Sequence, residues 1–238
     1  LLVMAALLSV LAYLDWARMG WYWLARQNHP GPASALASYT VSMEAQPVAG
    51  LVRNASGLTY SRASGMLFTV INRPAAVAEL GTDGQLLRHV PLPWLGDPEG
   101  ITHIRDDLFV ISDESDNTLH RVRIPQASQP VENAGIVDVP LDFRHWPNLG
   151  LEGVSWDETE GQLLLANEKW PRKVLLVQGL ALAGGPGAAA NVQVQNWRPR
   201  AWLGFLGRDL ASLTTHPASG NLLVLGEQSR LITEYSRR

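Results

Sequence analysis

The sequence contains no cysteine. This absence excludes disulfide-stapled scaffolds, thiolate catalysis, and zinc or iron–sulfur sites with cysteine ligands. It does not fix the compartment, because a chain without cysteine folds in oxidising and in reducing surroundings alike.

A surplus of positive charge is also lacking, since 19 Lys and Arg residues stand against 22 Asp and Glu, for a formal net charge of -3. A protein that neutralises nucleic-acid phosphates needs a basic surplus, so nucleic acid is not an expected partner. Lysine occurs only at Lys169 and Lys173, so the clustered cations of a phytase-like hydrolase are missing too.

Common catalytic motifs are absent as well: the sequence has no G-x-S-x-G, no G-x-x-x-x-G-K-[ST] and no H-E-x-x-H. Serine hydrolases, P-loop proteins and zinc peptidases therefore lose their main support. Residues 185–190 (GPGAAA) fit a dinucleotide motif superficially, but they lie in a stretch rich in Gly and Ala that is typical of a linker. Residues 113–117 (DESDN) begin like an EF-hand loop, yet Thr118 replaces its essential glycine, which favours a plain turn.

What the sequence does contain is enough apolar material for a core, with 46% hydrophobic residues over 238 positions. Its 21 Gly and 15 Pro separate many short apolar runs. Frequent turns between short runs indicate an all-β protein.

The first 25 residues differ from the rest, because Asp15 and Arg18 are their only charged side chains and Trp16, Trp21 and Trp23 gather at their end. This pattern predicts a membrane anchor over residues 1–25 with an aromatic belt. A cleaved signal segment or a soluble helix are the alternatives, since the 14 uncharged residues at the start are fewer than the roughly 20 of a spanning helix. The first residue is Leu rather than Met, so we expect a preceding stretch. Residues 26–38 are predicted to be a linker and residues 39–238 the globular domain.

Four copies of one pattern fill the globular part. In each copy a small residue, at 57, 100, 153 or 212, begins an apolar run, a turn follows, and a second apolar run ends at a polar residue, at 72, 114, 168 or 227. The separation of 14 or 15 residues fits two strands joined by a tight turn. Each copy is therefore a predicted β-hairpin.

Further apolar runs follow each hairpin, and the copies recur at intervals of 43, 53 and 59 residues. Repeats of this length with four antiparallel strands are typical of propeller blades. A β-sandwich is the alternative, but it gives no reason for a polar residue to recur at a fixed distance from a small one. The sequence thus predicts an all-β propeller of four-stranded antiparallel blades, preceded by a hydrophobic helix.

The recurring acidic residues predict a metal site. In a blade, the first strand begins and the second strand ends on the same face of the ring, so acidic side chains at these points should converge around the channel. Oxygen ligands without cysteine or clustered histidine suit Ca²⁺ or Mg²⁺. An alternative is that each Glu caps a loop by accepting backbone N–H bonds. The candidate ligands are Glu99, Glu152, Glu114, Glu168 and Glu227, together with Asp209, which could replace a missing carboxylate from the loop before Ala211. Asn72 is their neutral counterpart.

At these positions the chain resembles the SdiA-regulated family of bacterial envelope proteins, which are related to NHL-type propellers. The similarity extends over residues 39–235, and the stretches that carry it are residues 50–60 (GLVRNASGLTY), 67–79 (LFTVINRPAAVAE), 97–102 (DPEGIT), 108–116 (LFVISDESD), 151–154 (LEGV) and 222–230 (LLVLGEQSR). The resemblance implies a propeller of about five blades with a channel calcium and no established reaction. It also implies a location on the bacterial inner membrane, with the propeller facing the periplasm. Family members continue into another blade, so this propeller is expected to be C-terminally incomplete, with residues 39–45 as a candidate closing strand.

Two functions follow from these observations. The first is a non-enzymatic envelope propeller that binds calcium and holds a ligand or an envelope protein. The second is a metal-dependent hydrolase of the lactonase or phytase kind, with Glu114, Glu168 or Asp113 as a possible base. Fold alone does not decide between them.

Overall fold

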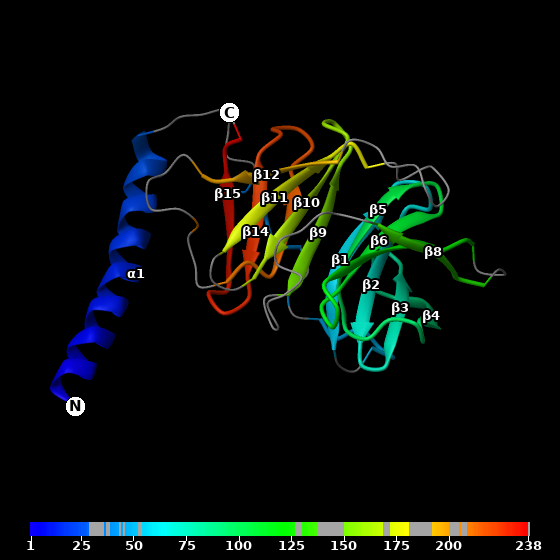
Figure 1. The fold of residues 1–238 in the computed structure, drawn as a ribbon, viewed down its shortest axis with the longest axis horizontal. Coiled ribbons are helices and arrows are strands. Elements are labelled where there is room, and N and C mark those ends of the chain that lie inside the picture. Colours follow the sequence, from blue (N-terminus) through cyan, green and yellow to red (C-terminus); the bar gives the residue numbers. More distant parts are fainter. Residues whose placement is uncertain are drawn as a thin grey trace.

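The computed structural model of the chain describes residues 1–28, 36, 39–42, 44, 46–51, 54–126, 130–137, 150–168, 172–180, 192–199, 205 and 209–237. Residues 29–35, 37 and 38 of the predicted linker (26–38) and the Gly/Ala-rich stretch at residues 185–190 lie outside these ranges. The described chain runs from one helix, α1, through strands β1 to β15 (Figure 1).

The strands form four antiparallel sheets, which confirms the predicted blades. The sheet of blade 4 has three strands among the described residues, and each of the others has four. The helix is α1 (Leu2–Asn28). Blade 1 holds β1 (Ala55–Ser61), β2 (Met66–Asn72), β3 (Ala75–Leu80) and β4 (Leu86–Pro91). Blade 2 holds β5 (Pro98–Arg105), β6 (Leu108–Asp113), β7 (Thr118–Arg123) and β8 (Glu132–Val137). Blade 3 holds β9 (Leu151–Asp157), β10 (Gln162–Asn167), β11 (Lys173–Gln178) and β12 (Gln193–Trp197), and blade 4 holds β13 (Ser212–Thr215), β14 (Leu222–Gly226) and β15 (Leu231–Tyr235).

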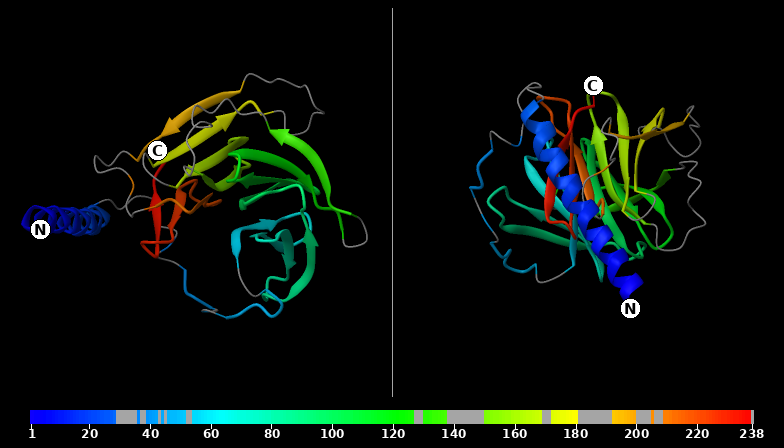
Figure 2. Two further views of the ribbon diagram at one scale, coloured as in Figure 1. Left: turned by 60° about the horizontal axis from the view of Figure 1, so that its bottom comes forward. Right: turned by 90° about the vertical axis from the view of Figure 1, so that its left-hand side faces the viewer.

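The four blades follow one another around a curve, as the left-hand view of Figure 2 shows. Their first strands, β1, β5, β9 and β13, contact one another in this order and line the inner side of the curve. The beginning of each first strand and the end of each second strand therefore lie on the same face, as the repeat predicted.

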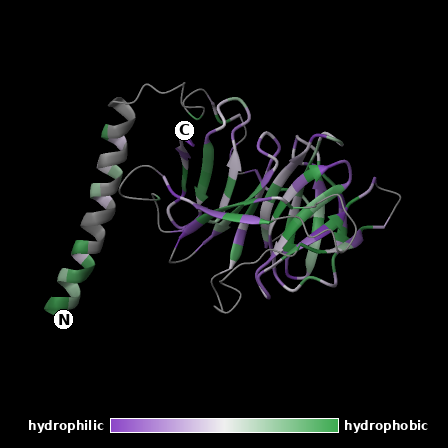
Figure 3. Ribbon diagram, turned by 45° about the horizontal axis from the view of Figure 1, so that its top comes forward, coloured by the Kyte–Doolittle hydropathy of each residue, from purple (hydrophilic) through white to green (hydrophobic). Residues whose placement is uncertain are grey.

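The core consists of layers between neighbouring blades. Phe109 and Ile111 of β6 pack toward blade 1, whereas Leu108 and Val110 of the same strand pack toward blade 3. Every residue of β6 and of β10 is buried, because a second strand in the middle of the curve has a blade on both sides. Outer strand β4 instead alternates between half-buried and exposed residues, as expected for a sheet face that reaches solvent. Figure 3 shows hydrophobic residues along the strands of the blades.

Hydroxyl side chains at one repeated position tie the first strands together. The Oγ1 atom of Thr59 accepts a hydrogen bond from the backbone N–H of His103 at 3.2 Å. Thr102 accepts one in the same way from the backbone N–H of Trp156 at 2.8 Å. These bonds satisfy backbone donors on the inner edges of β5 and β9, which have no strand partner there.

The segment before β1 contacts both blade 1 and blade 4. The Tyr39 hydroxyl lies 3.3 Å from Nε2 of His216 in blade 4, whereas Val48 and Leu51 pack against the apolar side of blade 1. The closing strand expected at residues 39–45 is not formed, since residues 39–42 and 44 have no β pairing. A side-chain contact, rather than a backbone ladder, joins Tyr39 to blade 4.

Helix α1 confirms the expected helical start of the chain. It lies apart from the strands in Figures 1 and 2, and Leu2, Leu7, Trp16 and Trp23 are all exposed. In the part of the chain that the structure describes, no helix combines the length and the apolar character that crossing a bilayer requires.

Glycines at the start of the first strands allow the blades to approach closely. A Cβ atom on Gly57 would lie 2.8 Å from the carbonyl oxygen of Glu99, and one on Gly100 would lie 2.6 Å from the carbonyl oxygen of Glu152. Gly153 stands in the same relation to blade 4, with 3.0 Å between its added Cβ and Cα of Ser212. These glycines therefore bring the backbone that carries Glu99 and Glu152 toward the preceding blade.

The substitution Gly100→Ala should destabilise the propeller, because its methyl group would meet the backbone carbonyl of Glu152 on the next blade at 2.6 Å. We expect a loss of about 1–3 kcal/mol, seen as a lower midpoint in thermal denaturation followed by circular dichroism. Gly20→Ala is the matched control, because nothing lies within 4 Å of an added Cβ at this helical position. Equal midpoints for the two variants would contradict the packing role of Gly100.

Candidate metal centre

Four of the predicted ligands come together at one mouth of the channel. Glu99 and Glu152 are the second residues of β5 and β9, and Glu114 and Glu168 directly follow β6 and β10. Carboxylate oxygens of Asp97, Glu99 and Glu114 all lie within 4.8 Å of one another. We call Asp97, Glu99, Glu114, Glu152 and Glu168 the acidic cluster.

The Glu152 carboxyl group shows the electrostatic cost of this arrangement. Burial, followed by the negative charges of Glu168, Glu99 and Glu114, raises its pKa from 4.5 to about 8. A hydrogen bond with Glu168 acts in the same direction. Like charges in a partly buried place disfavour full ionisation, so at neutral pH Glu152 retains its proton unless a cation enters.

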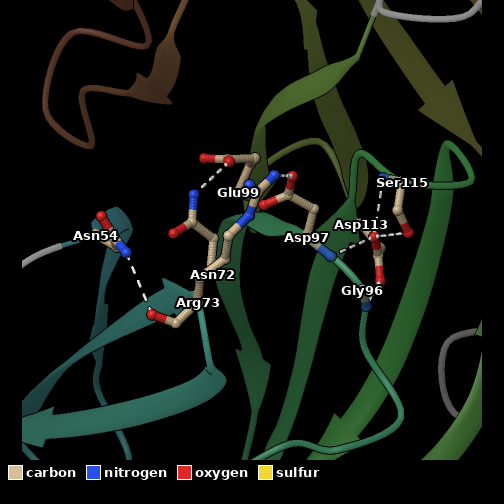
Figure 4. A network of polar contacts seen from close by, with 8 residues as sticks. All are labelled: Asn54, Asn72, Arg73, Gly96, Asp97, Glu99, Asp113 and Ser115. Carbon is tan, nitrogen blue, oxygen red and sulfur yellow. Dashed lines mark hydrogen bonds and ion pairs between the residues drawn. The ribbon is translucent and has the colours of Figure 1, made fainter.

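Asn72, the last residue of β2 in blade 1, and Arg73, which follows it, complete the site (Figure 4). The Asn72 side chain donates a hydrogen bond from Nδ2 to Oε1 of Glu99 at 3.0 Å. The Arg73 guanidinium donates to Oδ2 of Asp97 at 2.7 Å and is 74% exposed, whereas Asp97 is only 17% exposed. The hydrogen bond and charge of Asp97, with weaker contributions from Glu99 and Glu114, raise the pKa of Arg73 above its ordinary value.

Asp113 holds the loop that carries Asp97. Its carboxylate accepts hydrogen bonds from the backbone N–H groups of Gly96, Asp97 and Ser115, at 2.6, 3.0 and 3.0 Å. Burial pushes the pKa of Asp113 upward, but the hydrogen bonds from Ser115, Gly96 and Asp97 outweigh it, so the pKa lies below its ordinary value. This carboxylate is thus fixed in its charged form as a loop cap.

Asp209 caps the loop that follows β14 in blade 4. It is 1% exposed, and its Oδ2 accepts from the backbone N–H groups of Glu227 and Gln228 at 2.7 and 3.0 Å. Glu227 itself is exposed. No contact described for Asp209 or Glu227 joins them to the acidic cluster, so their part in a metal site stays a prediction.

Sequence reasoning missed Asp97 and Arg73 as members of the site. Asp97 stands two residues before Glu99, as Asp209 stands two residues before Ala211, so aligning the repeats at this earlier position would have marked it. No comparable signal marks Arg73, because its contact with Asp97 joins two blades and depends on how they pack.

The donor set of this mouth fits a hard cation. It consists of carboxylate and amide oxygens only, which Ca²⁺ and Mg²⁺ prefer. Within the described chain, the buried atoms Oδ1 of Asn72 and Oδ1 of Asp97 have no hydrogen-bond partner. Buried oxygens of this kind usually find a partner, and a cation would provide one.

The raised pKa of Glu152 predicts a pH dependence of stability. Between pH 4.5 and about 8, the folded protein keeps a proton on Glu152 that the unfolded chain has released, so the free energy of unfolding falls as pH rises. In Glu152→Gln this contribution disappears, and stability should fall less over the same range. Urea denaturation at several pH values, with a chelator present, measures the difference. Glu132→Gln, at an exposed glutamate of β8, is the control, and a Glu152→Gln curve parallel to the unmodified protein would contradict the assignment.

Comparison with known proteins finds one family match and a set of distant structural matches. The family described as SdiA-regulated matches residues 32–238. A chain of the nidogen/laminin complex has 13% identity and a TM-score of 0.49, and the match covers 74% of this chain and 57% of that one. Virginiamycin B lyase from Staphylococcus aureus has 15% identity and a TM-score of 0.44, with 76% and 55% covered. The chain therefore spans little more than half the length of these two proteins.

Proposed function

The chain belongs to the SdiA-regulated family, and we propose that it is a non-catalytic binding protein whose propeller holds a calcium ion at the acidic cluster. The observation that carries this proposal is the convergence of four glutamates from blades 2 and 3, which together with burial raises the pKa of Glu152 to about 8. Such repulsion is unfavourable for folding unless the charges serve to bind a cation.

The ligands would be the side chains of Glu99 and Glu152, with Glu114, Glu168 and the amide of Asn72 directly or through water. Ca²⁺ is favoured over Mg²⁺ because it accepts more oxygen ligands with less regular geometry, as a site assembled from three blades provides. The ion would supply positive charge that lets Glu152 ionise. Arg73 supplies one further positive charge at the rim through its ion pair with Asp97.

The double variant Glu99→Gln with Glu152→Gln tests this site. The unmodified protein should bind Ca²⁺ in isothermal titration calorimetry and gain about 2.7 kcal/mol of stability at a hundredfold excess over Kd. The double variant should lose both effects and keep its fold, because Gln retains the shape of Glu and removes its charge. The exposed pair Glu132→Gln with Glu160→Gln removes the same number of charges elsewhere and should bind Ca²⁺ normally.

Retention of the calcium-dependent stabilisation in the Glu99→Gln and Glu152→Gln variant would assign these glutamates to loop capping and refute the site. Failure of the unmodified protein to bind Ca²⁺ at millimolar concentration would also refute the calcium site.

One observation favours the alternative of a metal-dependent hydrolase. A carboxyl group with a pKa of about 8, as in Glu152, titrates in the range that a general acid or base needs near neutral pH. Assay of the purified protein on lactones and phosphate esters, with and without chelator, separates the two functions. Chelator-sensitive turnover that is lost in Glu152→Gln would establish catalysis and displace the non-catalytic proposal.

For α1 we propose attachment to a bacterial inner membrane, with the propeller on the periplasmic side. The exposed side chains of Leu2, Leu7 and Leu8 are apolar and would be stabilised by lipid. The chain should float with phospholipid vesicles in a density gradient, and a version without residues 1–28 should remain at the bottom. Flotation of both versions would place the membrane contact on the propeller, and flotation of neither would refute attachment.

A further inference from the structure

The opposite mouth of the channel opens into a cavity of about 870 Å³. Its walls are the final residues of β1, β5, β9 and β13 and the turns that follow them. The acidic cluster lies at the beginning of the same strands. On β5, Glu99 stands two residues before Ile101, the nearest wall residue, a rise of roughly 7 Å, and six residues before Arg105 at the far end of the wall, a rise of roughly 20 Å. The volume is in the usual range of small-molecule sites, about 300–1,000 Å³.

Hydroxyl groups from all four blades line this cavity, at Thr59, Thr102, Ser155 and Thr214. Because the oxygens of Thr59 and Thr102 accept from backbone N–H groups of the next blade, their own hydroxyl protons remain to be donated. Ser155 donates to Thr214 at 3.5 Å, which leaves the proton of Thr214 available in the same way. The wall therefore offers a row of hydrogen-bond donors to an oxygen-rich ligand.

Ion pairs neutralise most charged residues of the cavity. Arg62 forms an ion pair with Glu158, which joins blade 1 to blade 3 across the mouth. Arg237 forms another with Asp157. Arg105 and Asp106 are exposed, and among the described residues neither side chain has an ionic or hydrogen-bonding partner. The lining itself has two basic and three acidic side chains, and Arg237, which lies outside the lining, neutralises Asp157. With these pairs formed, one unpaired donor group and one unpaired acceptor group remain, and the cavity does not select for a charged ligand.

Aromatic surface completes the lining. Tyr60, 50% exposed, and Trp156 both contribute to the wall. Aromatic rings combine an apolar face with a polar edge. Such a ring suits a molecule that has C–H groups on one face and hydroxyl groups around its rim.

We propose that this cavity is a binding site for an uncharged carbohydrate of about disaccharide size. Sugar hydroxyl groups both accept and donate hydrogen bonds. They can accept from the Thr hydroxyls and from Arg105, and they can donate to the carboxylates of Asp106 and Glu158. The sugar ring faces match Tyr60. The site is independent of the acidic cluster, and its ligand binds with or without calcium.

Isothermal titration calorimetry of the full chain, in chelator, with maltose, cellobiose and di-N-acetylchitobiose tests the proposal. At least one of these sugars should bind with a Kd of about a millimolar or tighter. Tyr60→Ala and Arg105→Ala should each weaken that binding by about tenfold or more. Leu87→Ala, which removes another half-exposed side chain from the outer strand β4, should leave it unchanged, and circular dichroism should show the same fold in all three variants.

Absence of binding by all three sugars at concentrations of about 10 mM would overturn the proposal. So would equal affinities of the unmodified protein and both cavity variants. Tighter binding of glucose 6-phosphate than of the neutral sugars would replace the carbohydrate with an anion as the ligand. Dependence of sugar binding on Ca²⁺ would place the sugar at the acidic cluster instead of this cavity.

Discussion

The close approach of consecutive first strands is the constraint on which the site depends. It occurs where Gly57, Gly100 and Gly153 face the backbone of the next blade, at distances that leave no space for a Cβ atom. Because Glu99 and Glu152 directly precede two of these glycines in the chain, the contact that packs the blades also brings their carboxylates together. The repeated Glu-Gly pair thus combines a packing element with a charged group at the channel.

The same strands give the two mouths of the channel opposite characters. At their beginnings, acidic side chains repel one another, and Arg73 and Asn72 of blade 1 offset only part of that repulsion. At their ends, opposite charges pair across blades, and hydroxyl groups satisfy the inner strand edges. The first mouth is suited to a cation and the second to a neutral polar molecule.

Carboxylates at or next to the ends of the first and second strands have different roles because their hydrogen-bond partners differ. Asp113 and Asp209 accept several backbone N–H bonds and so fix the loops of blades 2 and 4. Glu152 has other carboxylates as its neighbours, and its pKa rises in consequence. Loop caps are stable as anions, whereas the members of the acidic cluster respond to cations and to pH.

The sequence by itself determined the hairpins, the blade repeat and the convergence of Glu99, Glu114, Glu152 and Glu168, because strand period and strand direction are local properties that residue spacing encodes. It also indicated Asp209 as a candidate ligand. It did not indicate that the carboxylate of Asp209 accepts hydrogen bonds from the backbone N–H groups of Glu227 and Gln228. Only the tertiary structure decided that Arg73 pairs with Asp97, that residues 39–42 and 44 form no strand, and that the far mouth opens into a cavity. These features depend on the distance and angle between packed blades, which arise from contacts between residues far apart in the chain and leave no periodic trace in its sequence.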